Sequence, residues 1–109
     1  MIKKASKVVF ISYELEKNFN SLKEDDPIRK AMVRAIHDLK ENAFSGIQIS
    51  KRLFPKEYIQ KYGINNLWKY DLPRGWRLLY TVTADNEVDL ISAILEWFDH
   101  KDYEKRFKY

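Results

Sequence analysis

The fold is decided by residues 64–82, INNLWKYDLPRGWRLLYTV, and by the run VDLISAILEWF at residues 88–98 that follows them. Apolar and polar side chains alternate over residues 67–72 and again over residues 76–83. This two-residue period is typical of a strand with one buried face. Pro73-Arg74-Gly75 between the two runs is a turn sequence. The stretch therefore predicts a β-hairpin followed by a third strand.

The alternation also assigns side chains to the two faces of the predicted hairpin. One face carries Trp68, Tyr70, Leu72, Trp76, Leu78, Tyr80 and Val82, and the other carries Lys69, Asp71, Arg77, Leu79 and Thr81. Residues 88–98 are apolar on both faces, which predicts a central strand covered by helices on at least one side. The tryptophans Trp68, Trp76 and Trp97 are predicted core residues, because strand alternation already explains their positions.

Upstream of the hairpin, the sequence predicts one strand and two helices. The β-branched run at residues 7–11 is typical of a strand. Ser12 is a suitable N-cap for a helix ending near Lys23, and Asp25-Asp26-Pro27 is a start signal for the next helix. The apolar stripe of this second helix contains Ile28, Met32, Ile36, Leu39 and Ala43. Gly46 is its predicted stop.

Shorter segments complete the expected order. Residues 56–62 predict a short helix that Pro55 opens and Gly63 ends, and residues 99–109 predict a short helix or a loose arm. The resulting order is β-α-α-(short α)-β-β-β-tail. It predicts an α+β fold with helices packed on one face of a mostly antiparallel, twisted sheet. A chain of 109 residues is expected to form a single domain, residues 1–109.

Composition excludes several classes of site. The chain has no cysteine, two histidines and three glycines, so disulfides, thiolate or histidine-rich metal sites and a glycine-rich phosphate loop are excluded. The formal net charge of +4 suits a nucleic acid, an acidic protein partner or an ordinary soluble protein. No apolar run reaches the roughly 18 residues of a membrane helix, and the run after the basic N-terminal residues is too short for a signal peptide. We expect a soluble cytoplasmic protein without membrane association.

The element order and two motifs resemble the RelE/ParE superfamily, the toxins of type II toxin–antitoxin systems. GWRLLYTV at residues 75–82 is similar to the family's strand after the hairpin, with its glycine, aromatic residue, arginine and tyrosine. HKDY at residues 100–103 is similar to the histidine- or arginine-rich segment that follows the last strand in several members. The resemblance covers residues 8–107. It implies the RelE-like order β-α-α-β-β-β.

The resemblance also implies a function. It indicates an mRNA endoribonuclease, associated with the ribosome, that cleaves RNA by attack of the adjacent 2′-hydroxyl and needs no metal or organic cofactor. An antitoxin protein is the implied partner and forms a hetero-oligomer with the toxin. The superfamily also contains gyrase inhibitors that cut no nucleic acid, so this function stays open as an alternative. An inactive member that only binds RNA or a partner is a third possibility.

Four residues are candidates for catalysis: Arg77, His100, Lys69 and Tyr103. The guanidinium of Arg77 can hold a phosphate through two hydrogen bonds, and His100 can serve as general acid or base near neutral pH. Lys69 would offset developing negative charge. Tyr103 would stack on a base or donate a hydrogen bond to a phosphate.

Each candidate also has a structural interpretation. Arg77 could pair with Asp71 or Glu96 across the sheet, Tyr103 could pack the tail against the sheet, and Lys69 and His100 could be solvated. Asp71 stands near a position where the resemblance implies a basic residue, so catalysis would depend on His100. Five further cations are candidates for RNA binding, with a solvated basic surface as their alternative: Lys51, Arg52, Lys56, Arg74 and Lys101.

Overall fold

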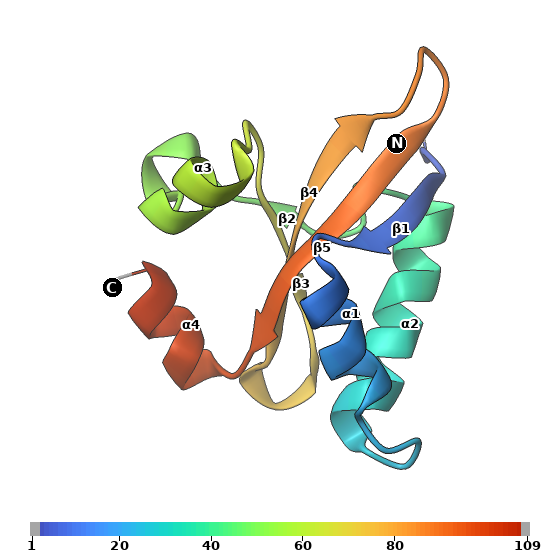
Figure 1. Ribbon diagram of the computed structural model, residues 1–109, viewed down its shortest axis with the longest axis vertical. Coiled ribbons are helices and arrows are strands. Elements are labelled where there is room, and N and C mark those ends of the chain that lie inside the picture. The colour runs from blue at the N-terminus through green and yellow to red at the C-terminus, as the bar shows by residue number, and fades with distance from the viewer. Residues whose placement is uncertain (1–2, 108–109) are drawn as a thin grey trace.

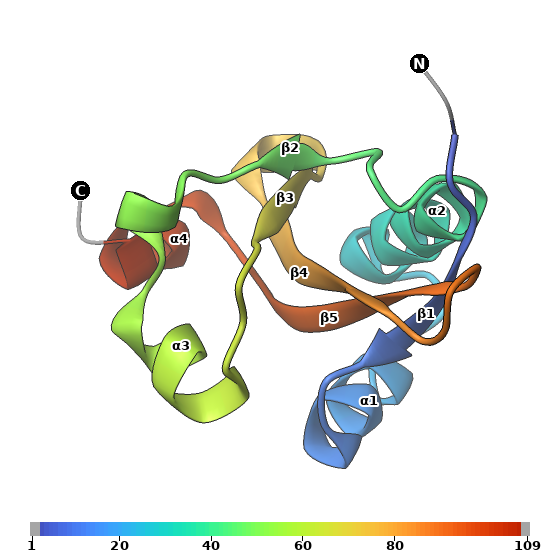
Figure 2. The same cartoon turned by 90° about the horizontal axis from the view of Figure 1, so that it is seen from above.

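The computed structural model describes residues 3–107, and within this range the chain forms one five-stranded sheet and four α-helices (Figures 1 and 2). The strands are β1 (Ser6–Phe10), β2 (Ile47–Gln48), β3 (Trp68–Asp71), β4 (Arg77–Ala84) and β5 (Leu90–Phe98). Their spatial order is β1-β5-β4-β3-β2. β1 runs parallel to β5, and every other neighbouring pair is antiparallel. The predicted α+β class with a mostly antiparallel sheet is confirmed.

The helices are α1 (Tyr13–Asn20), α2 (Pro27–Glu41), α3 (Lys56–Tyr62) and α4 (His100–Phe107), with short 3-10 helices at Lys51–Leu53 and Pro73–Gly75. The predicted start signals of the first two are confirmed. Ser12 Oγ accepts a hydrogen bond from the Leu15 N–H at 3.2 Å, and Asp26 Oδ1 accepts one from the Ile28 N–H at 2.8 Å. These bonds satisfy backbone donors that a helix leaves free at its first turn.

Both faces of the sheet are covered by helices, whereas the sequence predicted helices packed on one face and cover on at least one side of the last strand. Figure 2 shows α2 on one side of the sheet and α3 and α4 on the other. The first core joins α1 and α2 to the sheet through Phe19, Met32, Ala35, Leu39, Leu72, Leu78, Tyr80 and Ile94. The second core joins α3 and α4 to the opposite face through Tyr58, Leu67, Leu79, Leu95, Phe98, Tyr103 and Phe107. The tail is therefore a docked helix, because its Tyr103 and Phe107 supply apolar area to the second core.

Gly46 does not end the second helix, so this prediction is wrong. α2 ends at Glu41, and Asn42 caps it. Gly46 instead lies against the sheet, where an added Cβ would come within 2.4 Å of the Lys69 carbonyl oxygen and 2.8 Å of Tyr80 Oη. Only a residue without a side chain allows this approach of the two backbones. The short strand β2, which the sequence did not predict, begins at the next residue.

Tyr80 fastens the loop after α2 to the middle of the sheet. Its hydroxyl donates to the Ala43 carbonyl oxygen at 2.9 Å and accepts from the Gly46 N–H at 3.0 Å. The residue is fully buried. Burial is the largest cause that raises the pKa of Tyr80, from 10.0 to about 12. The neutral hydroxyl is therefore the form that the folded state requires.

We expect stability to fall as pH rises from about 10 to about 12, partly because of Tyr80. In this window the unfolded chain releases the tyrosine proton while the folded chain keeps it, so deprotonation favours unfolding. The free energy of unfolding should drop by about 1.4 kcal/mol per pH unit for this group. Denaturant unfolding from about pH 9 to about pH 12 measures the slope. Tyr80→Phe should be less stable at neutral pH but show a shallower slope, and equal slopes would contradict the assignment.

Candidate functional site

The candidate catalytic residues come from three elements that meet at one end of the sheet. Lys69 is on β3, Arg77 begins β4, and His100 and Tyr103 are on the first turns of α4. The strand register brings them together, because Arg77 lies opposite Asp71 on one side and opposite Phe98 on the other. The hairpin and the start of α4 are therefore neighbours in space, although about 25 residues separate them in the chain.

Lys69, Asp71, Arg77 and Tyr103 form one group, which we call the Arg77 cluster. The Lys69 Nζ atom lies 5.7 Å from the centroid of the Tyr103 ring, and the Arg77 Cζ atom lies 5.6 Å from it. Asp71 Oδ1 is 3.0 Å from Arg77 Nε and 3.9 Å from Lys69 Nζ. Two cations thus share one aromatic ring and one carboxylate. Asp71 is therefore the partner of Arg77, and it is one of the two partners that the sequence predicted.

The cations of the Arg77 cluster are largely covered. The Lys69 and Arg77 side chains are 24% and 19% exposed, whereas Asp71 is 51% exposed. The Arg77 Nη1 atom donates to the Trp76 carbonyl oxygen at 3.1 Å. The buried Nε–H of Arg77 is close to Asp71, but it makes no hydrogen bond with any described residue. Charge and distance, rather than a directed hydrogen bond, therefore hold this ion pair.

Tyr103 packs α4 onto the sheet. The residue is 5% exposed. Its ring stacks on Phe107 with centroids 4.6 Å apart and meets Phe98 edge-on at 6.0 Å. These contacts agree with the structural interpretation of Tyr103, in which the residue packs the tail of the chain against the sheet. Base stacking would require a ring face that these contacts already occupy.

His100 lies beside the Arg77 cluster and is open to solvent. It begins α4, its side chain is 60% exposed, and its Nε2 atom is 2.7 Å from Glu104 Oε1. A Cβ added to Gly75 would lie 3.2 Å from His100 Cβ, so the turn of the hairpin packs directly against the histidine. Within residues 3–107, no ion pair or hydrogen bond joins His100 to Arg77. Sequence analysis missed Glu104, although its four-residue spacing from His100 on a predicted helix was the available signal.

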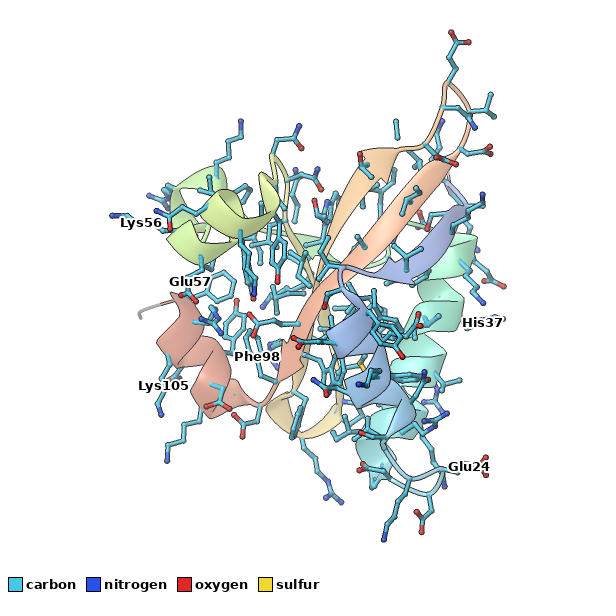
Figure 3. The ribbon with its side chains drawn as sticks, viewed as in Figure 1. Glu24, His37, Lys56, Glu57, Phe98 and Lys105 are labelled. Carbon is cyan, nitrogen blue, oxygen red and sulfur yellow. The ribbon has the colours of Figure 1, made fainter. Side chains whose placement is uncertain are left out.

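The RNA-binding candidates fall into two groups, and all five are exposed. Lys51 and Arg52 lie on a 3-10 helix, and Lys56 begins α3 and projects away from the sheet (Figure 3). Arg74 and Lys101 flank the contact between Gly75 and His100. Arg74 has a φ of 60°, which is uncommon for a residue with a side chain. The structure thus places two of the five cations at the candidate site.

A second polar cluster, which sequence analysis missed, joins α3, β5 and α4. Tyr58 Oη donates to Glu96 Oε1 at 2.5 Å, Arg106 Nη2 donates to Glu96 Oε2 at 3.0 Å, and Arg106 also pairs with Glu57. Burial, reinforced by Glu96, raises the pKa of Tyr58 far above its ordinary value, so its hydroxyl stays protonated and donates. Glu96, a charged residue near the end of the apolar run 88–98, was the available sequence signal. The cluster anchors α4 and also explains why Glu96 does not pair with Arg77.

Neither a metal site nor a relative helps to define this region. Among residues 3–107, no three histidine or acidic side chains are grouped so that they could hold a metal ion. In the same range, no helix is long and apolar enough to cross a membrane. Comparisons with protein-family models, curated proteins and solved structures find no match for the chain.

Proposed function

We propose that this protein is a RelE/ParE-like toxin that acts as a metal-independent mRNA endoribonuclease at the ribosome. The observation that carries the proposal is the convergence of Lys69 and Arg77 on the Tyr103 ring, with His100 beside them at the start of α4. Two cations suit the negative charge of a phosphodiester, and an exposed imidazole suits proton transfer at neutral pH. The motif resemblance at residues 75–82 and 100–103 supports the same function.

The proposed reaction is an internal transphosphorylation. A base removes the proton of the ribose 2′-hydroxyl, the 2′-oxygen bonds to phosphorus, and the bond from phosphorus to the 5′-oxygen breaks. An acid protonates the leaving 5′-oxygen, so the products are a 2′,3′-cyclic phosphate and a 5′-hydroxyl. His100 is the proposed proton-transfer group, and the Glu104 carboxylate would orient its ring.

Arg77 and Lys69 are the proposed groups that stabilise the transition state. Both cations already face one carboxylate, Asp71, whose position a phosphate could take. Arg77 Nε–H has no hydrogen-bond acceptor among the described residues, so a phosphate oxygen would supply a bond that Asp71 does not. A guanidinium holds phosphate oxygens through paired donors, which favours Arg77 as the main contact.

The proposed protein partner is a cognate antitoxin that works in the cytoplasm. An acidic or amphipathic segment of the antitoxin would cover the basic surface around Arg74 and Lys101, next to His100. Such a segment would block RNA by occupying the same positive charges. The complex would then be a hetero-oligomer of toxin and antitoxin.

His100→Ala should reduce RNA cleavage by at least about a hundredfold, because a positioned proton-transfer group contributes that much or more. Cleavage is measured on mRNA with and without ribosomes, and growth arrest is followed on expression. His37→Ala is a matched control, since His37 is also exposed and also faces a glutamate four residues later, at 3.9 Å. It projects from α2 away from α4 (Figure 3). Full cleavage by His100→Ala protein would contradict the proposal.

The second candidate is a non-catalytic toxin of the same fold that inhibits DNA gyrase. The pairing of both cluster cations with Asp71 favours it, because paired cations are less available to a phosphate. This function predicts growth arrest without RNA cleavage, DNA-damage signalling and toxicity that does not change in His100→Ala. Recovery of gyrase with the protein would support it.

A further inference from the structure

A groove between α2 and the β3–β4 turn lies outside the Arg77 cluster. Pro27, Lys30 and Arg34 of α2 line one wall, and Tyr70, Leu72 and Pro73 line the other. Its volume is about 590 Å³, within the range of pockets that hold nucleotide-sized ligands. We call it the α2 groove.

The two cations of the α2 groove, Lys30 and Arg34, are exposed and form no ion pair with any described residue. By contrast, Lys69, Arg77 and Arg106 each have a carboxylate partner. Asp71 also lines the groove but is paired with Arg77. The groove therefore has a net positive charge that an anionic ligand would neutralise.

The wall of the α2 groove contains a fixed aromatic ring. Tyr70 donates its hydroxyl to Asp38 Oδ2, which holds the ring in place. Burial and this hydrogen bond raise the pKa of Tyr70 to about 12, and the positive charge of Arg34 acts on the same hydroxyl in the opposite direction. Arg34 and the Tyr70 ring are thus neighbours. An aromatic ring beside unpaired cations is the combination that binds single-stranded nucleic acid, through base stacking and phosphate contacts.

The α2 groove lies on the α2 face of the sheet, and the β3–β4 turn connects it to the candidate catalytic residues on the other face. Pro73 lines its end, and Gly75, two residues later in the same turn, packs against His100. Figures 1 and 2 both show this turn between α2 and the start of α4. A strand that filled the groove would pass over exposed Arg74 and bring its next phosphodiester beside His100.

We propose that the α2 groove is a binding subsite for single-stranded RNA, which seats one nucleobase against Tyr70, Leu72 and Pro73 and two phosphates on Lys30 and Arg34. This inference rests on the proposed ribonuclease function, because RNA in the groove would reach the residues assigned to that reaction around the β3–β4 turn. The subsite holds the substrate next to the cleaved bond and takes no part in the chemical step.

Binding of a fluorescent single-stranded RNA decamer, measured by anisotropy at several salt concentrations, tests the subsite. Lys30→Ala/Arg34→Ala should weaken binding at least tenfold at low salt. The slope of log affinity against log salt should become shallower by about 1.4, because each phosphate contact in a single strand contributes about 0.7. Lys23→Ala/Lys40→Ala removes the same charge from α2 and the residues before it, outside the groove, and should change binding much less. A decamer with abasic sites should bind wild-type protein more weakly.

The outcomes separate the subsite from the proposed function. If Lys30→Ala/Arg34→Ala protein binds RNA like the Lys23→Ala/Lys40→Ala control while His100→Ala abolishes cleavage, the subsite is overturned and the ribonuclease proposal stands. If a poly-glutamate decamer binds through Lys30 and Arg34 and RNA does not, the groove is a protein-docking site and the subsite is overturned. A tenfold loss of RNA affinity in Lys30→Ala/Arg34→Ala, together with the shallower salt slope, would support the subsite. If the wild-type protein cleaves no RNA in the same experiments, that result contradicts only the ribonuclease proposal.

Discussion

Replacing Gly46 by alanine is expected to destabilise the protein by about 3 kcal/mol or more, as overpacking against a backbone atom does. The new Cβ would lie 2.4 Å from the Lys69 carbonyl oxygen and 2.8 Å from Tyr80 Oη. Backbone that is paired in a sheet cannot yield as a flexible side chain would, so β2 would separate from β3. The hydrogen bond from the Gly46 N–H to Tyr80 Oη would also be lost. Denaturant unfolding gives the change in free energy directly.

Gly63→Ala is the matched control for this prediction. Gly63 ends α3 with a φ of 60°, but nothing lies within 4 Å of an added Cβ. The substitution therefore costs only the strain of a left-handed residue, about 1 kcal/mol. Similar losses in the two variants would mean that close packing at Gly46 is not important, and the explanation of this glycine would be wrong.

Glu96→Ala is expected to destabilise the protein by about 2 to 3 kcal/mol, since it leaves Arg106 with one carboxylate and Tyr58 with no acceptor for its buried hydroxyl. The Glu96 and Arg106 side chains are 27% and 29% exposed, so the loss should lie below that of a fully buried ion pair. Because the cluster joins β5 to α3 and α4, hydrogen exchange in α4 should accelerate together with the loss of stability.

Two further variants separate the effect of an unpaired charge from the loss of packing. Glu57 is 59% exposed and points from α3 toward α4 (Figure 3), so Glu57→Ala should cost less than about 1 kcal/mol. Glu96→Leu/Arg106→Met removes both charges and should be more stable than Glu96→Ala, because no half-covered guanidinium is left without its Glu96 partner. A double variant less stable than Glu96→Ala would show that packing at Glu96, rather than the charge, dominates.

Strand and helix patterns in the sequence predicted local structure wherever a regular period or a cap was present. The two faces of β3 and β4 follow from alternation, and the starts of α1 and α2 follow from Ser12 and Asp26. The sequence did not predict β2, because a strand of two residues is too short to show a two-residue period. Gly46 was misread because a glycine near a helix end usually stops the helix, and its real reason is an approach to residues 69 and 80.

The candidate site was partly predictable for the same reason. Lys69, Asp71 and Arg77 share a face because side chains alternate along each strand. The ion pair of Arg77 with Asp71 was one of the two pairs that the sequence predicted. Two other features could not be predicted, because they join residues far apart in the chain. Tyr58 and Glu96 are separated by 38 residues, and Arg34 and Tyr70 of the α2 groove by 36.

The sequence by itself determined the class of fold, the faces of the hairpin and the side chains available for chemistry, because these depend on neighbours within a few residues. The tertiary structure alone decided that α3 and α4 cover the second face of the sheet and that Tyr103 is buried under two cations. It also decided which charges are neutralised and which stay free. The physical reason is that docking of α4 depends on the sum of many weak apolar contacts and one polar cluster between distant segments, and no local pattern records that sum.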